Sequence, residues 1–501
     1  MLDALISGTL AVFVPSVLGI ILLGVVIGIV VGILPGIGGV TTIAIMLPFM
    51  YKWDPRVSLS LVIAMYAATY SSGLITSILL GIPGEANASA TLLDGYPMCQ
   101  QGKAARAMSA GFMASMLGGI IGAFVLAGLI PVARPIVLWF GSPELFALSM
   151  LGVCFIALLS RGSTIKGVVM GLLGILTAFV GVFSFTGTPR FTFGLFYLYD
   201  GVPLVAVAIG IFAIPELIDM IVGGGIVKTQ VKVGQMHGVW EGIKDCFRHW
   251  RTVLCCSALG AGLGLIPGVG VIATVFVAYG LARLISKQPQ EFGLGCVEGV
   301  IGPEAADNAK EGGGLITTLA FGLPAGISMA MVLVILMMAG ISPGVDIMVK
   351  HLDMVWSLVI ALIVSNIMAT GIGLATAKYL ARLVHVRMNF LAPIILLLVL
   401  VGAYGLNSRV EDVILAFIVG GIGYLMKKFE FSRVTFIVGF VLGDLLERYF
   451  LLSVGTLGPT FLIKKPVALA LLLTLIPVFG QQWIRDIYRK LRSRRARRTR
   501  S

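Results

Sequence analysis

Long runs of apolar residues alternate with short polar loops along nearly the whole chain, and runs such as Ile394–Val401 and Ala468–Leu473 contain apolar residues only. Continuous runs predict membrane helices, because the strands of a membrane barrel would alternate apolar and polar positions. A helix needs about 20 residues to cross the hydrocarbon layer, so several runs are too short to cross alone. The predicted segments are 8–34, 39–50, 57–72, 106–132, 143–160, 166–184, 202–223, 253–266, 270–286, 294–302, 353–381, 390–404, 411–426, 433–450 and 466–484.

Polar and glycine-proline interruptions divide these segments into larger parts. Two further apolar stretches, 73–93 and 313–340, are broken by glycine and proline. The longest polar stretch, Val227–Arg251, separates two halves of the chain. The expected organisation is a first membrane half at 1–226, a cytoplasmic connecting segment at 227–252, a second membrane half at 253–484 and a basic cytoplasmic tail at 485–501.

The two halves share an internal repeat. Gly32–Gly39 (GILPGIGG) matches Gly264–Val271 (GLIPGVGV), and Gly73–Gly84 (GLITSILLGIPG) matches Gly314–Ala325 (GLITTLAFGLPA) at six of twelve positions. The two matches occur in the same order, offset by 232 and 241 residues. Two proline-centred matches in order predict a duplicated core.

The distribution of Lys and Arg predicts how the two copies are oriented, because basic loops favour the cytoplasmic side. Val227–Arg251 and the C-terminal tail are basic, whereas residues 1–51 contain no Lys or Arg, so the N-terminus is expected in the periplasm. Lys103 and Arg106 indicate the cytoplasm after the first broken segment. The copies then cross in opposite directions, as in many secondary transporters. We expect an all-α polytopic membrane protein with about 10–14 spans, two re-entrant or broken hairpins and an inverted structural repeat.

Composition excludes a soluble protein of this length. Hydrophobic residues make up 58% of the chain and charged residues 12%, against about 25% charged residues in soluble domains. The net charge of +13 does not indicate nucleic-acid binding, since nine of the 36 basic residues lie in Arg485–Arg500. A basic tail of this kind favours the cytoplasmic side and attracts anionic membrane lipid.

The sequence contains no motif of an enzyme or of a cofactor site. The six cysteines form no CxxC pair and the four histidines no HExxH spacing, so disulfides and zinc are not expected. Neither a dinucleotide fingerprint nor a GxxxxGK[ST] sequence is present. We expect no catalytic residue, no cofactor and no metal site beyond one for Na⁺, so transport must draw on an ion gradient or a partner.

Four helix breaks are the candidate binding elements: Pro35-Gly36, Pro83-Gly84, Pro267-Gly268 and Pro324-Ala325-Gly326. Unpaired backbone groups at membrane depth are tolerated where they line a cavity, and helix N-termini attract carboxylates. Hydroxyls and amides near the breaks can bind a carboxylate, or alternatively bond to neighbouring helices. The predicted substrate-binding residues are Ser71, Ser72, Thr76, Ser77, Pro83, Gly84, Asn87, Ser89, Thr317, Thr318, Pro324, Gly326 and Ser328.

Acidic residues near the breaks are candidates for cation binding, because a charge inside the bilayer needs a cavity or a partner. Glu85 follows Pro83-Gly84, and Asp307 precedes Asn308; either carboxylate can bind Na⁺ or carry a proton. Asp94 is expected to end a helix or shape a turn, and Lys310 to lie at a segment end. The predicted cation-binding residues are Gly36, Gly38, Glu85, Gly268, Gly270, Asp307 and Asn308.

These motifs resemble a known family. The resemblance rests on GILPGIGG, on YSSGLITSILLGIPGEANASATLLDGYP with QGKAARA, and on GLIPGVG, EGVIGPEAADNA and GLPAGISMA. They are similar to the large membrane subunit of tripartite tricarboxylate transporters (TctA-type), over nearly the whole chain. The resemblance implies a multi-pass carrier of the bacterial inner membrane that takes up di- or tricarboxylates with Na⁺ or H⁺. It also implies two partners, a small four-helix membrane subunit and a periplasmic substrate-binding protein.

The expected mechanism is alternating access, with a carboxylate bound between the two hairpin tips and cations bound nearby. Two alternatives remain open at the level of sequence. A gated anion channel would show downhill flux that does not depend on a cation gradient, and a non-transporting membrane scaffold would show no flux.

Overall fold

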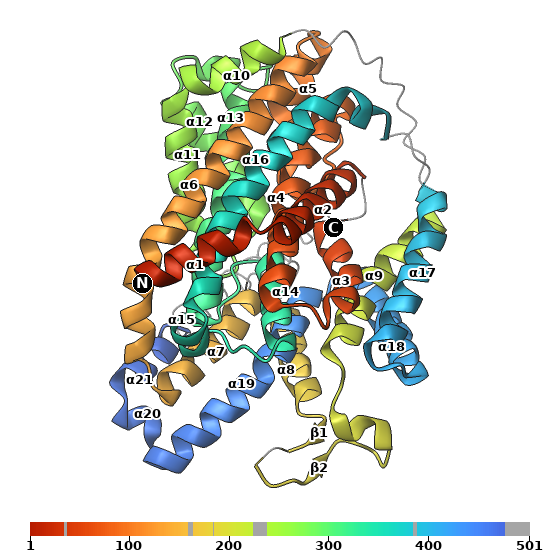
Figure 1. The fold of residues 1–501 in the computed structure, drawn as a ribbon, viewed down its shortest axis with the longest axis vertical. Coiled ribbons are helices and arrows are strands. Elements are labelled where there is room, and N and C mark those ends of the chain that lie inside the picture. Colours follow the sequence, from red (N-terminus) through yellow and green to blue (C-terminus); the bar gives the residue numbers. More distant parts are fainter. Residues whose placement is uncertain (35–37, 159–163, 184, 224–237, 384–387, 476–501) are drawn as a thin grey trace, which may run out of the picture. The chain divides into compact units, whose positions relative to one another are not determined.

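A computed structural model describes residues 1–34, 38–158, 164–183, 185–223, 238–383 and 388–475 (Figure 1). Within these ranges the chain is helical apart from one two-stranded antiparallel sheet. Gly36 and the predicted tail 485–501 lie outside the described residues. The chain divides into two compact units, Met1–Val137 with Pro203–Leu425, and Leu138–Val202 with Met426–Ser501. The predicted halves 1–226 and 253–484 describe the sequence repeat, and this division by contacts does not test them.

The first unit contains most of the helices and both copies of the repeat. Its elements are α1 (Leu2–Val12), α2 (Pro15–Ile33), α3 (Gly39–Met50), α4 (Pro55–Leu80), the 3₁₀ turn η1 (Ala86–Ser89), α5 (Leu92–Gln100), α6 (Ala104–Trp139), α9 (Leu204–Gly223), α10 (Val239–Arg248), α11 (Trp250–Gly264), α12 (Val271–Ile285), η3 (Pro289–Glu291), α13 (Glu298–Phe321), α14 (Ile327–Met338), α15 (Val345–Lys350), α16 (Leu352–Leu383), α17 (Met388–Asn407) and α18 (Val410–Lys428).

The second unit is smaller and contains the only β-strands of the described chain. Its elements are α7 (Ser142–Leu158), α8 (Thr164–Ala178), β1 (Gly181–Val182), β2 (Pro189–Arg190), η2 (Phe196–Asp200), α19 (Arg433–Leu457), α20 (Phe461–Lys464) and α21 (Pro466–Leu473). Strand β1 pairs with β2, and α19 packs on α7 and α8. Arg190 pairs through both terminal nitrogens with Glu447, at 2.6 and 2.8 Å.

Length and hydropathy support a polytopic membrane protein. Five helices of the described chain are long and apolar enough to span a membrane: Pro15–Ile33, Pro55–Leu80, Ala104–Trp139, Leu204–Val222 and Leu352–Ala377. Seven shorter apolar helices accompany them. The all-helical membrane class is therefore confirmed, whereas the expected number of spans stays a prediction.

Two helices of the first unit are enclosed by protein along almost their whole length. Every residue of α4 from Ser58 to Leu80 is buried, and so is every residue of α13 from Glu298 to Ala320. Helix α4 packs on α2, and α13 packs on α11 and α12, which lie together with α10 in Figure 1. Each enclosed helix therefore belongs to one copy of the repeat.

Helix α2 lies against α4 through glycines spaced four residues apart. A Cβ atom added to Gly28 would lie 2.4 Å from the carbonyl oxygen of Met65, and one added to Gly32 would lie 2.4 Å from that of Thr69. Neither position has room for a side chain. Small residues at this spacing let membrane helices approach to backbone contact.

Helix α11 repeats this contact on α13. A Cβ atom on Gly260 would lie 2.2 Å from the carbonyl oxygen of Ala306, and one on Gly264 would lie 2.3 Å from that of Lys310. Gly264 and Lys310 occupy the positions of Gly32 and Thr69 in the repeat. The contact between α2 and α4 in the first copy is thus repeated by the contact between α11 and α13 in the second copy.

Asp94 joins parts of the chain that are far apart in sequence. Its Oδ1 accepts hydrogen bonds from the backbone N–H groups of Gly293, Gly295 and Cys296 at 2.8, 2.9 and 2.8 Å. Its Oδ2 accepts from the hydroxyl of Tyr279 at 2.8 Å. The residue lies in the first turn of α5, so it does not end a helix, and the turn that it shapes is the distant one between α12 and α13.

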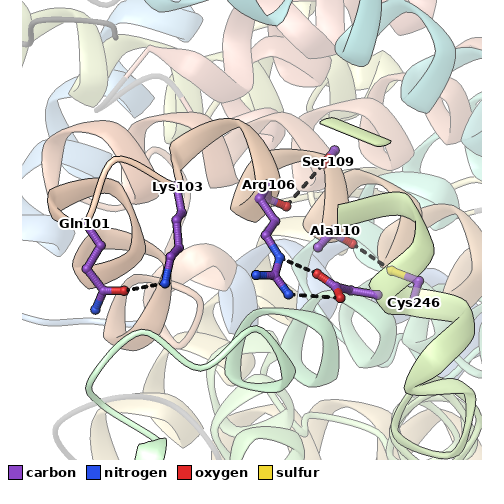
Figure 2. A network of polar contacts seen from close by, with 7 residues as sticks. Gln101, Lys103, Arg106, Ser109, Ala110 and Cys246 are labelled. Carbon is purple, nitrogen blue, oxygen red and sulfur yellow. Dashed lines mark hydrogen bonds and ion pairs between the residues drawn. The ribbon is translucent and has the colours of Figure 1, made fainter. Parts of the chain in front are cut away.

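The polar segment after residue 238 is fastened to α6 by one ion pair. Figure 2 shows Arg106 pointing toward α10, where its Nε and a terminal nitrogen donate to the two carboxylate oxygens of Asp245 at 2.5 and 3.0 Å. The neighbouring Cys246 donates through Sγ to the carbonyl oxygen of Ala110 at 3.2 Å. Arg106, expected at a segment end, therefore lies in the first turn of α6 and also pairs with a buried carboxylate.

We expect Arg106→Gln to destabilise the first unit, because Asp245 is buried and would lose its charged partner. Loss of such a partner costs about 2 kcal/mol or more. Thermal unfolding of the purified protein in detergent measures the effect. Arg248→Gln, at an exposed position of α10, is the matched control, and equal unfolding temperatures for the two variants would contradict the assignment.

We also expect Gly260→Ala to lower the unfolding temperature, because the new methyl group meets the Ala306 carbonyl at 2.2 Å. Overpacking of this kind costs roughly 1–3 kcal/mol. Gly262→Ala lies on the same helix with nothing within 4 Å of its Cβ, so it should leave the unfolding temperature unchanged or raise it slightly. A similar loss in both variants would show that helix propensity, and not close packing, sets the result.

Candidate functional site

Helices α4 and α13 both end in a left-handed glycine. Gly81 has φ 68° and Gly322 has φ 67°, and the two residues occupy matching positions of the repeat. Only glycine adopts this conformation without strain. The predicted interruptions of 73–93 and 313–340 thus lie where the sequence placed them. That the chain re-enters the membrane there stays a prediction.

Helices α3 and α12 also begin alike. Their N-caps, Gly38 and Gly270, have φ/ψ of −68°/156° and −63°/151°. Gly268 has a positive φ of 80° in the loop before α12. The matching local geometry is what a duplicated core requires, while the inverted orientation of the copies stays a prediction.

The loop after α4 is packed tightly against the neighbouring helices. A Cβ on Gly84 would lie 2.2 Å from Oγ1 of Thr76 and 2.4 Å from the carbonyl oxygen of Gly32. In the second copy Ala325 stands at the position of Gly84, and a Cβ on Gly326 would have Nζ of Lys310 as its neighbour at 3.5 Å. Pro83 and Pro324 lie in these two loops.

Polar residues from both copies meet between α4, η1 and α13. The side-chain amide of Asn87 donates to the carboxylate of Asp307 and, at 3.2 Å, to the carbonyl oxygen of Tyr70. The amide of Asn308 donates to Oγ of Ser71 at 3.0 Å. Four predicted side chains are thus brought into one cluster from positions more than 200 residues apart: Ser71 and Asn87 as substrate-binding candidates, and Asp307 and Asn308 as cation-binding candidates.

Three oxygen atoms of this cluster have no hydrogen-bond partner among the described residues. They are Oδ1 of Asn87, Oδ1 of Asp307 and Oδ1 of Asn308. The three residues are only 4%, 2% and 1% exposed. Buried acceptors are normally satisfied. Unsatisfied amide and carboxylate oxygens are the ligand type of hard cations such as Na⁺, or sites for a proton.

Two further residues belong to this neighbourhood although the sequence did not single them out. Asn308 donates to Oδ1 of Asn366, a residue of α16, at 2.6 Å. The carboxylate of Glu304 accepts from the hydroxyls of Thr91 at 2.6 Å and Ser115 at 2.8 Å. Asn366 is an isolated amide in an apolar run, and Glu304 lies three residues before Asp307 on a buried helix. Those two features of the sequence could have identified Asn366 and Glu304 as candidate site residues.

Most of the predicted hydroxyl residues donate to backbone carbonyls. Ser72 donates to Gly28 at 3.3 Å, and Thr318 donates to Gly314 at 2.6 Å. The same kind of bond is made by Thr76, Ser77, Ser89 and Thr317. These hydroxyl groups thus donate hydrogen bonds within helices, within turns and between neighbouring helices. Bonding between helices was the alternative to substrate binding that the sequence left open.

Ser328 lies in the first turn of α14, after the second helix break, and is 2% exposed. Glu85 lies in the loop after α4. The Glu85 carboxylate accepts from the backbone N–H of Gly39 at 2.5 Å, so it caps the start of α3.

The buried face of α13 carries unusual charge for an enclosed helix. Glu304, Asp307, Lys310 and Glu311 are at most 5% exposed. Lys310 therefore lies in the middle of α13 and not at a segment end as the sequence suggested. Charges buried at membrane depth mark functional sites, because their burial is costly.

Comparison with known proteins identifies a family and two relatives. Residues 18–438 match the description "Tripartite tricarboxylate transporter TctA family". An "Uncharacterized 52.8 kDa protein in TAR-I ttuC' 3'region" of Agrobacterium vitis is 32% identical over 454 residues, which is 90% of each chain. An "Uncharacterized protein in TAR-II ttuC' 3'region" of the same organism is 30% identical over 217 residues, covering 42% of this chain and 89% of the relative. No solved structure matches. The chain, with its buried charged helix and its paired helix breaks, therefore belongs to the tripartite tricarboxylate transporter TctA family.

Proposed function

We propose that this chain is the large membrane subunit of a secondary carrier that takes up di- or tricarboxylates across the bacterial inner membrane. A cation gradient, of Na⁺ or H⁺, drives the uptake. A periplasmic substrate-binding protein delivers the anion, and a small four-helix membrane subunit completes the assembly. Family membership supports a transporter component with partners of this kind.

The observation that carries the proposal is the cluster of Asn87, Asp307 and Asn308. It unites the two copies of the repeat and leaves three buried oxygen atoms without a donor from the described part of the chain. Such a set suits a desolvated cation, as the broken helices of secondary transporters do. A membrane scaffold would have no use for three unsatisfied acceptors, each of which costs about 1–3 kcal/mol.

Charge on α13 supports coupling between a cation and an anion. The buried stretch carries four acids and a single base, Lys310; the acids are Glu298, Glu304, Asp307 and Glu311. Its formal charge is negative, so it opposes an incoming carboxylate until cations or protons offset it. An anion that binds only after cations have bound is the basis of symport.

Alternating access fits the duplicated geometry. Two copies with matching helix breaks, placed in opposite orientation, make the inward-open and outward-open states similar in energy. The orientation proposed from the basic residues places the C-terminus in the cytoplasm and the N-terminus in the periplasm. A gated anion channel is the alternative, and it would conduct carboxylates without saturation and without a cation gradient.

We expect Asp307→Asn to reduce cation-driven uptake at least tenfold, because it removes the one charged ligand of the cluster while keeping its shape. The measurement is uptake of labelled citrate and other carboxylates by cells expressing all three subunits, with Na⁺ or with a pH gradient alone. Glu291→Gln, an exposed acid of η3, is the matched control and should transport normally.

The dependence on cation concentration separates the possible outcomes. In Asn87→Ala, half-maximal uptake should require several times more Na⁺, since one oxygen ligand is lost. Wild-type rates in Asp307→Asn under every gradient would remove the cluster from the transport cycle. Uptake by the wild-type protein that ignores both gradients would favour the channel.

A further inference from the structure

The first copy of the repeat holds a carboxylate of its own at a helix start. Glu85 follows the Pro83-Gly84 break, and its Oε1 lies 2.5 Å from the backbone nitrogen of Gly39, the first residue of α3. A Cβ added to Gly38 would lie 3.3 Å from the same oxygen. The start of a helix attracts an anion through its free N–H groups and its dipole. An anion site is thus present here, filled by the chain itself.

The second copy lacks this carboxylate. Gly326 stands at the position of Glu85, and no side chain of the described residues caps the start of α12. Gly270, which matches Gly38, is exposed and has nothing within 4 Å of an added Cβ. The start of α12 is therefore open at the place where Glu85 covers the start of α3.

The second copy also has a buried positive charge that the first copy lacks. Lys310 occupies the position of Thr69, whose methyl group lies 3.1 Å from a Cβ built on Gly39. In the first copy a side chain at this position lies beside the start of α3, and the repeat leads us to expect Lys310 at the corresponding place beside α12. Lys310 is 2% exposed, and its Nζ lies 3.5 Å from a Cβ built on Gly326. The ammonium thus points to the residue that replaces Glu85.

No hydrogen bond or ion pair joins this ammonium to any residue that the structure describes. Glu311 and Asp307 are near enough to act on its charge, but neither lies within 4.0 Å of Nζ as an ion pair. A buried ammonium is costly unless a hydrogen-bonded anion accompanies it. Offsetting the acids of α13 at longer range would account for the charge of Lys310, but not for the uncapped start of α12.

We propose that Lys310 and the start of α12 at Gly270–Val271 bind one carboxylate group of the transported anion. The inference rests on the proposed function, in that it assigns a place to a substrate of that class. Glu85 is then the chain's own counterpart of the substrate carboxylate. The two copies differ because one anion site is permanently filled and the other is filled only when the substrate is present.

The experiment places a tethered carboxylate in the open site. Gly326 has an extended backbone, φ −177° and ψ −171°, so a side chain is tolerated there, as at Glu85 with φ −122° and ψ 158°. In Gly326→Glu the new carboxylate should pair with Lys310. Gly326→Gln, of nearly the same size without the charge, is the matched control.

Two readouts are taken on the full chain purified in detergent with NaCl. Without substrate, Gly326→Glu should unfold at a higher temperature than Gly326→Gln, because it supplies the missing anion, whereas a steric clash would affect both alike. With citrate as the probe, affinity should fall at least tenfold in Gly326→Glu and in Lys310→Gln, and less than threefold in Gly326→Gln.

The outcomes separate this inference from the proposed function. If the wild-type protein binds and transports citrate but Lys310→Gln and Gly326→Glu bind it as tightly as Gly326→Gln does, the inferred subsite is wrong and the carrier function stands. If Gly326→Glu raises the unfolding temperature but the wild-type protein transports no carboxylate of the panel, the anion site stands and the proposed function falls. Equal unfolding temperatures of the Glu and Gln variants would overturn the anion site itself.

Discussion

Backbone contact between helices is the constraint on which this structure depends. Backbone carbonyl groups of α4 and α13 lie directly against glycines of α2 and α11. A side chain at these glycine positions would have no space. That approach encloses α4 and α13, whose polar residues build the site. It also brings the loop at Gly84 to within van der Waals distance of Gly32. One added methyl group at these contacts would displace the helix that carries the charges.

Enclosure gives the charges of α13 their significance. In water a helix with four acids and one base would be ordinary. Surrounded by protein, each of these groups needs a counterion, a proton or a donor. Glu304 accepts from the hydroxyls of Thr91 and Ser115, whereas one oxygen of Asp307 has no donor within the described ranges. This difference in hydrogen bonding distinguishes the structural carboxylate of Glu304 from the carboxylate of Asp307, which is available to a mobile ion.

The sequence predicted the breaks well, because glycine and proline act locally. Gly81 and Gly322 end their helices as the repeat indicated. The polar cluster contains Asn87, Asp307 and Asn308, which the sequence named separately as substrate-binding and cation-binding candidates. The sequence did not predict partners that depend on tertiary packing. Nothing in its spacing connects Asn366 with Asn308.

The misplacement of Lys310 has a specific cause. Pro303 and the dense charges of EAADNAKE resemble the boundary of a membrane segment. The helix nevertheless continues, because Pro303 lies near its start and neighbouring helices, in place of lipid, surround the charged residues. The short strands β1 and β2 were missed as well, since two-residue strands leave no alternating pattern.

Asp94 has a consequence for how the protein is made. Its carboxylate is completed by N–H groups that lie 199 to 202 residues further along the chain. A ribosome must therefore translate well past the midpoint before this acid finds its donors. Until then the first half of the nascent polypeptide carries an unsatisfied anion in an apolar setting. Biogenesis of the first half thus waits for the second, so we expect the two halves to assemble together and not as successive independent folding events.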